Sequence, residues 1–522
     1  MSGAVVPISA GTRGSRILEQ WNAQRRAERA VAAQAGKFHR NFAGAAVSRL
    51  TASMAAWSGS VNSDLDASLV ILRARARALC ANTELGRRFL SLVASNLVGA
   101  DGPRLQVRAL TDAGKLDTGI NNAVEAHWAK WAKQADVTGR MCFAEMLEIV
   151  ATSAARDGES LVRLVRNRAL PYGLGLQLLE ADRLDESINQ VLRNGNVIRM
   201  GVELNAFGRP LAYHVRTSHP GENYVSVKPG VERVPAADIL HPFVIERAEQ
   251  TRGYTWMHSV LVRMDMLHGF EEAAVIAARV GASKMGVFKK SAEADPNAGL
   301  ELATGRDEST GLPQMSAQPG EFIELPAGYE LQSWDPDYPH QNFESFLKAC
   351  IRGVAAGLNV AAHNLSGDMT DVNYSSARIA EMSERDYWRM RQRWLINAVV
   401  MPVYTEWLRT ALANDALTFE SGLTLPAAKI PAMYARLLDR SRFQPRTWAW
   451  VDPLKDVEAA KAQIGAGLSS RTQVAASQGR EFEDIVDELK AEQDKLADVG
   501  VTLDNTPAPA APPPPPPNEA DQ

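Results

Sequence analysis

The stretch FESFLKACIRGVAAGL, residues 343–358, decides the fold more than any other part of the chain. Its apolar residues recur at intervals of three and four, which gathers them on one face of a helix. This face consists of Phe343, Phe346, Leu347, Cys350, Ile351, Val354, Ala355 and Leu358. The pattern predicts an amphipathic helix whose apolar face packs against neighbouring elements.

A second long helix is predicted on the N-terminal side of this stretch, over residues 255–283. Its apolar side carries Met257, Val260, Leu261, Met264, Leu267 and Val275. Residues 284–340 lose the helical spacing and contain polar loops with two strand-like runs, Phe322–Leu325 and Tyr329–Trp334. This order predicts two helices that flank a compact insert.

On the C-terminal side, a Gly- and Asn-rich loop, Gly357–Asn373, leads into a long helix over Ser375–Leu412. Pro402 is expected to kink or break that helix, because proline removes a backbone donor and clashes with the preceding turn. Shorter helices follow. One opens at Asp452–Pro453, the next at Ser469 or Ser470, and a third covers Glu481–Leu496.

The N-terminal half mixes helices with short strands. Helical spacing covers residues 65–98 and, as two helices, 116–157. Strands separated by turn signals are predicted at Ser160–Asn167, Leu174–Leu179, Val197–Leu204, Leu211–Val215 and Glu232–Pro235. The chain is therefore predicted to have an α+β fold that is predominantly helical, with disordered termini.

Composition places the chain among ordinary soluble proteins. Its 522 residues fit two to four sub-domains, and 45 % are hydrophobic. The 57 basic and 61 acidic residues give a net charge of -4, without the basic excess of a protein that grips DNA phosphates. Three cysteines argue against a disulfide framework and favour folding in a reducing cytoplasm. Neither a secretion signal nor a run of about 18 apolar residues is present, so no membrane association is expected.

The sequence contains no motif that would make this chain an enzyme. It lacks the glycine-rich loop before Lys-Ser/Thr that cradles phosphates, and it lacks a Gly-x-Ser-x-Gly nucleophile. The nearest nuclease-like set is Asp337, Glu344 and Lys348. The last two are four residues apart on a predicted helix, which is the spacing of a surface ion pair. We therefore expect no catalytic residues, cofactor or metal.

Two other polar groups also have ordinary explanations. Glu180 and Asp182 lie on one side of a strand-like segment, and pairing with Arg183 or Arg193 is expected. The histidines are scattered, and His219 follows a predicted strand near a turn, where a surface or core role is expected.

Several short motifs, taken in order, resemble the lambda-type phage portal proteins. Gly357–Val360 followed by Asn373–Arg378 is similar to a helix end that leads through a polar loop to a "YSxAR" helix start. Gln250–Gly253 matches a "QTRG" motif before a long helix, and Ile464–Ser470 with Gly479–Ile485 is similar to a C-terminal pattern. Further agreement comes from Gly158-Glu159, Glu180–Asp182, Tyr387 and residues 389–393. The resemblance covers residues 40–495, and within it 291–318 is poorly matched. The N-terminal arm and the Pro-rich C-terminal tail have no counterpart in the family.

The resemblance implies a phage portal fold, in which a subunit has a wing, a helical stem hairpin, a clip and a crown. It implies a ring of about twelve subunits with an axial DNA channel. The corresponding division of this chain is an N-terminal arm (1–60), a wing (61–254), a stem helix (255–283), a clip (284–340), a second stem helix (341–358), a tunnel loop (359–374), a long kinked helix with the wing–crown connection (375–450), a helical crown (451–498) and a Pro-rich tail (499–522).

The resemblance also implies site residues. The stem would pack through Phe343, Phe346, Leu347, Ile351 and Val354. The tunnel loop would offer DNA short polar side chains: Asn364, Ser366, Asp368, Thr370, Asp371 and Asn373. An ordinary surface loop is the alternative reading. Arg385, Arg389 and Arg393 share a helix face and are expected to pair with acidic groups of a neighbour or to face solvent rather than bind DNA.

The implied partners are further copies of the chain, double-stranded DNA without sequence preference, the terminase large subunit, the major capsid protein or scaffold, and the head–tail connector. The implied place is the portal vertex of a virion capsid, after assembly in the host bacterial cytoplasm. The rival interpretations are another head–tail connector or capsid component, and a capsid-associated protease. A connector would be shorter, and a protease would need a nucleophile.

Overall fold

The computed structural model describes residues 59–499, together with Ala23 and Arg26. Within that range the following lie outside the description: 112, 223–229, 283–285, 291–304, 307–312, 315–328, 334–342, 419–428, 449–452, 479 and 481. Nearly all of the predicted arm, most of the predicted clip and almost all of the Pro-rich tail therefore fall outside the described residues. The described part is mostly helical with several small sheets, which confirms the α+β prediction.

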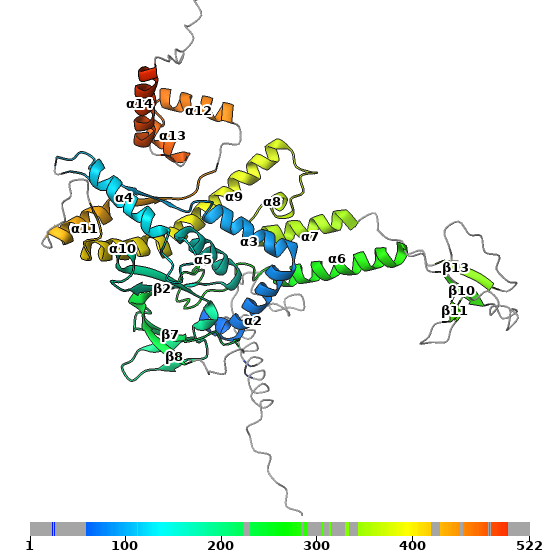
Figure 1. Ribbon diagram of the computed structural model, residues 1–522. Coiled ribbons are helices and arrows are strands. Elements are labelled where there is room, and N and C mark those ends of the chain that lie inside the picture. The colour runs from blue at the N-terminus through cyan, green and yellow to red at the C-terminus, as the bar shows by residue number, and fades with distance from the viewer. Residues whose placement is uncertain are drawn as a thin grey trace, which may run out of the picture.

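Four helices open the body of the molecule (Figure 1). The predicted helical region 65–98 divides at Thr83, whose hydroxyl oxygen accepts a hydrogen bond from the Gly86 amide at 3.2 Å and so caps the second helix. The main core gathers aromatic rings from distant segments, with Trp128 against Trp407 at 5.2 Å and against Phe443 at 5.6 Å between ring centroids. The helices are α2 (Val61–Asn82), α3 (Glu84–Leu97), α4 (Thr118–Ala132) and α5 (Phe143–Asp157).

Two small antiparallel sheets follow, with a second apolar core that includes Leu161, Leu184 and Val215. One predicted strand was wrong. The run 197–204 is a hairpin, because Met200 and Gly201 both adopt positive φ and reverse the chain. The first sheet has the order β3–β2–β9 and the second β4–β5–β6–β7–β8. Their strands are β2 (Leu161–Arg166), β3 (Leu174–Leu179), β4 (Gln190–Val191), β5 (Val197–Arg199), β6 (Val202–Leu204), β7 (Pro210–Arg216), β8 (Val231–Pro235) and β9 (Ile239–Leu240).

Helices α6 (Leu261–Ala282) and α7 (Phe343–Leu358) form an antiparallel pair that extends from the body (Figure 1). The Phe270 ring stacks on Phe343 with centroids 5.7 Å apart and meets Phe346 edge-on at 5.4 Å. The predicted helix start at 255 was wrong by six residues. The Thr255 hydroxyl and the Trp256 amide both donate to the Ala155 carbonyl, which holds this segment as turns against α5.

Beyond the far end of this pair, strands β10 (Gly286–Lys290) and β13 (Tyr329–Ser333) form an antiparallel ladder. Strands β11 (Gly305–Arg306) and β12 (Pro313–Gln314) form a second one. The predicted strand-like run at 329–334 is thus confirmed over its first five residues, whereas 322–325 lies outside the described residues.

The C-terminal half begins with a short helix, α8 (Ala362–Ser366), inside the region predicted as loop. The long predicted helix is interrupted as expected. A π-helical segment, Ile396–Val400, precedes Pro402, which occupies the first turn of the next helix. The remaining elements are α9 (Tyr374–Leu395), α10 (Met401–Ala413), α11 (Ile430–Asp439), α12 (Pro453–Gly465), α13 (Arg471–Ser477), α14 (Phe482–Val499) and the strand pair β1 (Arg104–Val107) with β14 (Ser441–Gln444).

Candidate assembly and channel surfaces

Two of the short sequence motifs meet in a buried charged network. Glu159 follows α5 and is fully buried. The Arg252 guanidinium, also fully buried, donates to both carboxylate oxygens of Glu159 at 2.9–3.0 Å, and the Gly253 amide donates at 2.9 Å. Arg73 of α2 adds a further hydrogen bond at 2.9 Å, and the His241 ring lies 2.9 Å from the second carboxylate oxygen. One carboxylate thus connects three segments to the "QTRG" stretch.

The motif glycines let these segments approach closely. Gly158 has a φ of +96°, and a side chain there would lie 2.3 Å from the backbone of Tyr254. A side chain at Gly253 would lie 2.2 Å from the Gly158 carbonyl oxygen. Only glycine combines this backbone conformation with such close contact. The two motifs therefore form one structural junction rather than two ligand sites.

The network is charged at neutral pH. The Arg252 charge, with the hydrogen bond from His241, holds the pKa of Glu159 well below its usual value against the opposing effect of burial. Burial lowers the pKa of His241, so its ring is neutral and donates to the carboxylate. Asp157, one residue before the junction, is held ionised by Arg156 and Arg77, which lower its pKa against the effect of burial.

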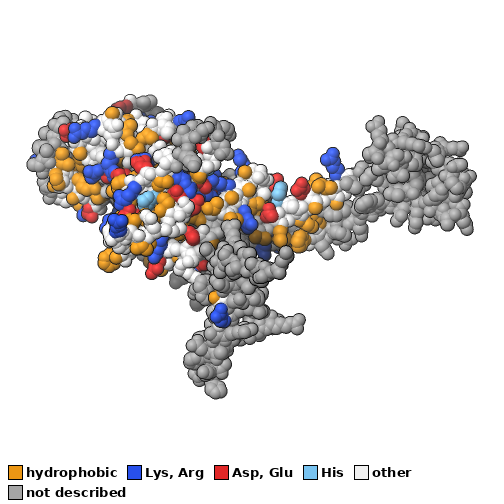
Figure 2. Space-filling view, turned by 90° about the horizontal axis from the view of Figure 1, so that it is seen from below, with side chains coloured by type: hydrophobic (Ala, Val, Ile, Leu, Met, Phe, Trp, Pro, Cys, Tyr) orange, Lys and Arg blue, Asp and Glu red, His pale blue; other side chains and the backbone are white. Residues whose placement is uncertain are grey.

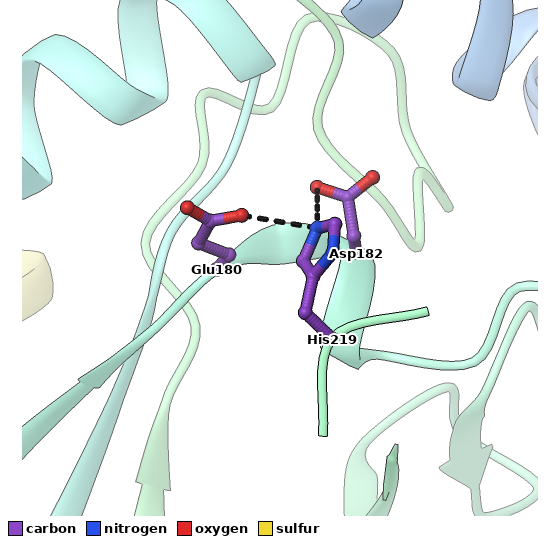
Figure 3. Close-up of side chains that lie close together, drawn as sticks. All are labelled: Glu180, Asp182 and His219. Carbon is purple, nitrogen blue, oxygen red and sulfur yellow. Dashed lines mark ion pairs between the residues drawn. The ribbon is translucent and has the colours of Figure 1, made fainter. Parts of the chain in front are cut away.

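Glu180, Asp182 and His219 converge at the surface beside this network (Figure 3). The His219 Nε2 atom is 3.1 Å from Glu180 and 3.7 Å from Asp182. The Arg77 guanidinium is 2.6 Å from Asp182 and 3.9 Å from Glu180. Because Arg77 already neutralises these carboxylates, the group is an ion-pair cluster and we assign no metal to it.

The predicted partners of these two carboxylates were wrong. Asp182 pairs with Arg73 and Arg77 of α2, whereas Arg183 donates to the carbonyl oxygens of Arg216 and Thr217. The sequence could not indicate this pairing, because α2 lies about a hundred residues earlier in the chain.

The predicted packing face of α7 is only partly covered by the part of the chain that the structure describes. Val354 is completely buried, and Phe343, Leu347 and Ile351 are half-buried. Phe346 remains 53 % exposed despite its contact with Phe270. Large exposed apolar side chains gathered on one helix are typical of a surface that another protein covers.

The predicted tunnel-loop residues fall into two groups. Asn364 belongs to α8 and is held in place. Its side-chain amide donates to Glu384 at 2.8 Å, and its backbone carbonyl oxygen accepts from Arg88 at 2.9 Å. Leu365 beside it is buried in the main core. Asn373 caps α9 by accepting from the Ser376 amide at 2.8 Å.

The segment between these anchors is exposed. The Ser366 hydroxyl donates to the carbonyl oxygen of Ala362, and Asp368 accepts from the Thr370 amide and hydroxyl. Lys348 of α7 lies 2.9 Å from Asp371 and 3.1 Å from the Thr370 hydroxyl. These contacts hold the 367–372 loop beside α7.

A groove of about 460 Å³ lies between α7 and the 362–372 segment. Its floor includes Leu347 and Ile351, and its rim carries charges of both signs. The Lys348 ammonium lies 2.8 Å from the Glu344 carboxylate, which confirms the predicted surface ion pair. Asp337, the third member of the nuclease-like set, lies outside the described residues.

The arginine row of α9 is engaged locally. Arg385 pairs with Glu381 at 3.4 Å, and Arg389 pairs with Asp386 at 2.7 Å. The guanidinium groups of both also lie 5.8 Å from the Trp448 ring centroid. Both acidic partners belong to α9 itself rather than to a neighbour, and the Arg389 side chain is 64 % exposed. Stacking on Trp448 could not be seen in the local pattern.

Within the part of the chain that the structure describes, no helix is both long and apolar enough to cross a membrane.

Comparisons with known proteins agree with the motif order. The sequence profile described as "Phage portal protein, lambda family" matches residues 47–392. The "Probable portal protein" of Halomonas phage phiHAP-1 is 31 % identical over 454 residues, which cover 85 % of each chain. "Portal protein B" of Escherichia phage lambda is 22 % identical over 399 residues, covering 70 % of this chain and 72 % of that one.

Among solved structures, the neck of an empty gene transfer agent particle aligns with 79 % of this chain and 93 % of its own, at 16 % identity and a TM-score of 0.43. The match over most of the chain in sequence is the decisive finding, since it includes both motifs of the buried junction. The chain belongs to the lambda family of phage portal proteins.

Proposed function

We propose that this chain forms a ring of about twelve copies at one vertex of a phage head, and that double-stranded DNA is packaged and ejected through the ring axis. The observation that carries the proposal is the α6–α7 pair. It extends from the body and leaves large apolar side chains uncovered, among them Phe346 and Met266. A closed ring would cover such a surface, because each subunit then presents one patch to a different patch of its neighbour.

In this proposal the chain is divided as the sequence suggests. Residues 61–254 form the wing, α6 and α7 with their flanking residues (255–283 and 341–358) form the stem, and 284–340 form the clip. Residues 359–374 form the tunnel loop, 375–450 connect the wing to the crown, and 451–498 form the crown. The antiparallel pairing of α6 with α7 supports the stem, and the β10–β13 ladder at its far end is consistent with a compact clip.

The exposed 367–372 loop is the proposed contact with DNA. Its polar side chains, Asp368, Thr370 and Asp371, are short, and the two carboxylates do not attract a phosphate backbone. Strong phosphate contacts would add affinity that is independent of sequence and would slow DNA movement. Weak contact suits a channel.

The family is structural, and we propose that this chain carries out no catalysis. The proposed partners are the terminase large subunit during packaging, the head–tail connector afterwards, and the major capsid protein or scaffold around the ring. The proposed location is the portal vertex of the virion, after assembly in the host cytoplasm.

The first test is the mass and shape of the purified chain. We expect a particle of about twelve times 56.8 kDa with a central hole in negative stain. A chain that remains monomeric at micromolar concentration would contradict the ring.

The second test concerns the loop. Shortening 367–371 to two glycines should leave ring assembly unchanged and reduce the number of DNA-filled heads. The deletion must stop short of Leu365, which is buried, and Asn373, which caps α9. A matched control shortens 193–196, a surface turn of the five-stranded sheet, and should package normally. Normal packaging by the loop variant would remove the loop from the DNA path.

A further inference from the structure

Helix α6 carries an exposed apolar ridge. Val262, Met266 and Ile276 are 61 %, 70 % and 54 % exposed, and Gly269 and Ala273 lie between them at the same helical face. The spacing of four, three, four and three residues is that of a seam between packed helices. Hydrophobic side chains gather along the α6–α7 pair in Figure 2. Nothing within the described chain covers the ridge.

The ridge and the α7 groove lie on different flanks of the helix pair. Helix α6 faces α7 through Arg263 and Phe270, and Val260, just before α6, lies against Gly357. Each residue turns the helix by about 100°, so Val262 and Met266 lie on another face. On α7, the residues that line the groove, Leu347 and Ile351 among them, differ from those that contact α6. One subunit therefore presents a ridge on one flank and a groove on the other, as a heterologous ring contact requires.

The heights of the two features also agree. Gly353 lies beside Arg263, and Phe346 lies beside Phe270, so each step forward along α6 corresponds to one step back along α7. Met266 is consequently level with residue 350, between Leu347 and Ile351. In a closed ring, equivalent residues of all copies share one height along the axis. With the pair lying along that axis, the ridge of one copy meets the groove of the next without a shift.

Charge supports the same alignment. Asp265 is exposed beside the ridge, and Arg352, 63 % exposed, stands at the groove rim one residue away in height. The Arg352 guanidinium has a distant partner in its own chain, Asp371 at 3.7 Å. An acidic group of an adjacent copy at this rim would therefore lie close enough to pair with the Arg352 guanidinium.

We propose that the α6 ridge of each subunit docks into the α7–loop groove of the adjacent copy, with Met266 over Leu347 and Ile351 and with Asp265 beside Arg352. The partner is a second copy of this chain, and the proposal rests on the ring proposed above. The loop that is proposed to touch DNA then forms one wall of the subunit contact, which couples loop position to the neighbouring stem.

Disulfide trapping tests the contact. In a Cys350→Ala background, Met266→Cys combined with Leu347→Cys should give covalent multimers after mild oxidation of purified rings, seen as a ladder on a non-reducing gel. The matched control is Ile276→Cys with Leu347→Cys. It uses the same ridge but places the thiol about 15 Å further along α6, and should give no ladder. Rings of the first variant that stay uncrosslinked overturn the docking and leave the ring itself standing.

Charge reversal decides the question if the cysteine variant does not assemble. Asp265→Arg and Arg352→Asp should each lower ring yield about tenfold through like-charge contact, and the combined variant should recover to within about twofold of the original chain. Absence of recovery, or full yield from both single variants, overturns the docking. Cross-links from position 266 to residues 1–58, found by mass spectrometry, would show that the arm covers the ridge instead and would also overturn it. An unaltered chain that stays monomeric would count against the ring proposal itself.

Discussion

Loss of Glu159 should destabilise the fold strongly, because several buried donors share its carboxylate. Glu159 is fully buried and accepts hydrogen bonds from Arg252, Arg73 and the Gly253 amide. In Glu159→Ala, the buried Arg252 guanidinium loses its carboxylate partner, while Arg73 keeps only Asp182 at 3.1 Å, and breaking a buried pair typically costs about 3–5 kcal/mol. Urea unfolding at pH 7 and fixed protein concentration would measure this loss.

The matched control for this prediction is Glu232→Ala. Its carboxylate pairs with Arg163 at 2.8 Å but is 48 % exposed. Exposed pairs contribute roughly 0–1 kcal/mol, so this variant should unfold almost like the original chain. Equal effects of the two substitutions would show that burial does not set the importance of Glu159.

At the scale of single elements, Lys348 determines how firmly the loop is held against α7. Hydrogen bonds and charge from Glu344 and Asp371 raise the pKa of its ammonium group, which stays charged at neutral pH. Lys348→Met keeps most of the stem and removes the contacts with Thr370 and Asp371. Amide hydrogen exchange at 367–372 should then speed up at least several-fold, while exchange in α7 stays unchanged.

Arg352→Met is the comparison for this element, because its own-chain contact with Asp371 is longer, at 3.7 Å. We expect a smaller change in exchange from it. If the two variants release the loop equally, the Lys348 contacts are not what positions it.

Elements were predictable from sequence where the pattern was local. The face of α7, the interruption before Pro402 and the starts of α12 and α13 follow from spacing, proline chemistry and a capping serine at Ser470. Strand pair β1–β14 was missed, because two four-residue segments more than 330 residues apart give no local signal. The start of α6 was misplaced for a similar reason, since the Ala155 carbonyl that holds Thr255 belongs to a different element.

The same distinction applies to the candidate site. Sequence could indicate which motifs belong together, but not that Arg252 reaches Glu159 and Arg73 across three segments. It also suggested one flexible loop at 359–374, where tertiary contacts build α8 around the buried Leu365. The local sequence pattern therefore could not predict the positions of side chains that are fixed by partners far away in the chain.

For the whole molecule, the buried junction should make stability depend on pH. The pKa values of Glu159, Asp157 and Asp182 are lowered in the fold by their arginine partners, so their contribution is present above about pH 4 and is lost as pH falls. Burial lowers the pKa of His241 from 6.5, so the unfolded chain binds a proton that the fold resists below that pH. Both effects have the same sign.

The free energy of unfolding should therefore decline as pH falls from 6.5, gently at first and steeply near pH 4. Urea unfolding at pH 7.5, 6, 5 and 4 in one buffer series would measure this decline. His241→Gln keeps a donor for Glu159 but cannot take up a proton, so the gentle part of the decline should shrink while the steep part remains. Because the junction joins α2, both sheets and the turn before α6, acid should release them in one cooperative step. A profile that is flat from pH 7.5 to 4 would mean that the junction does not govern the stability of the assembled molecule.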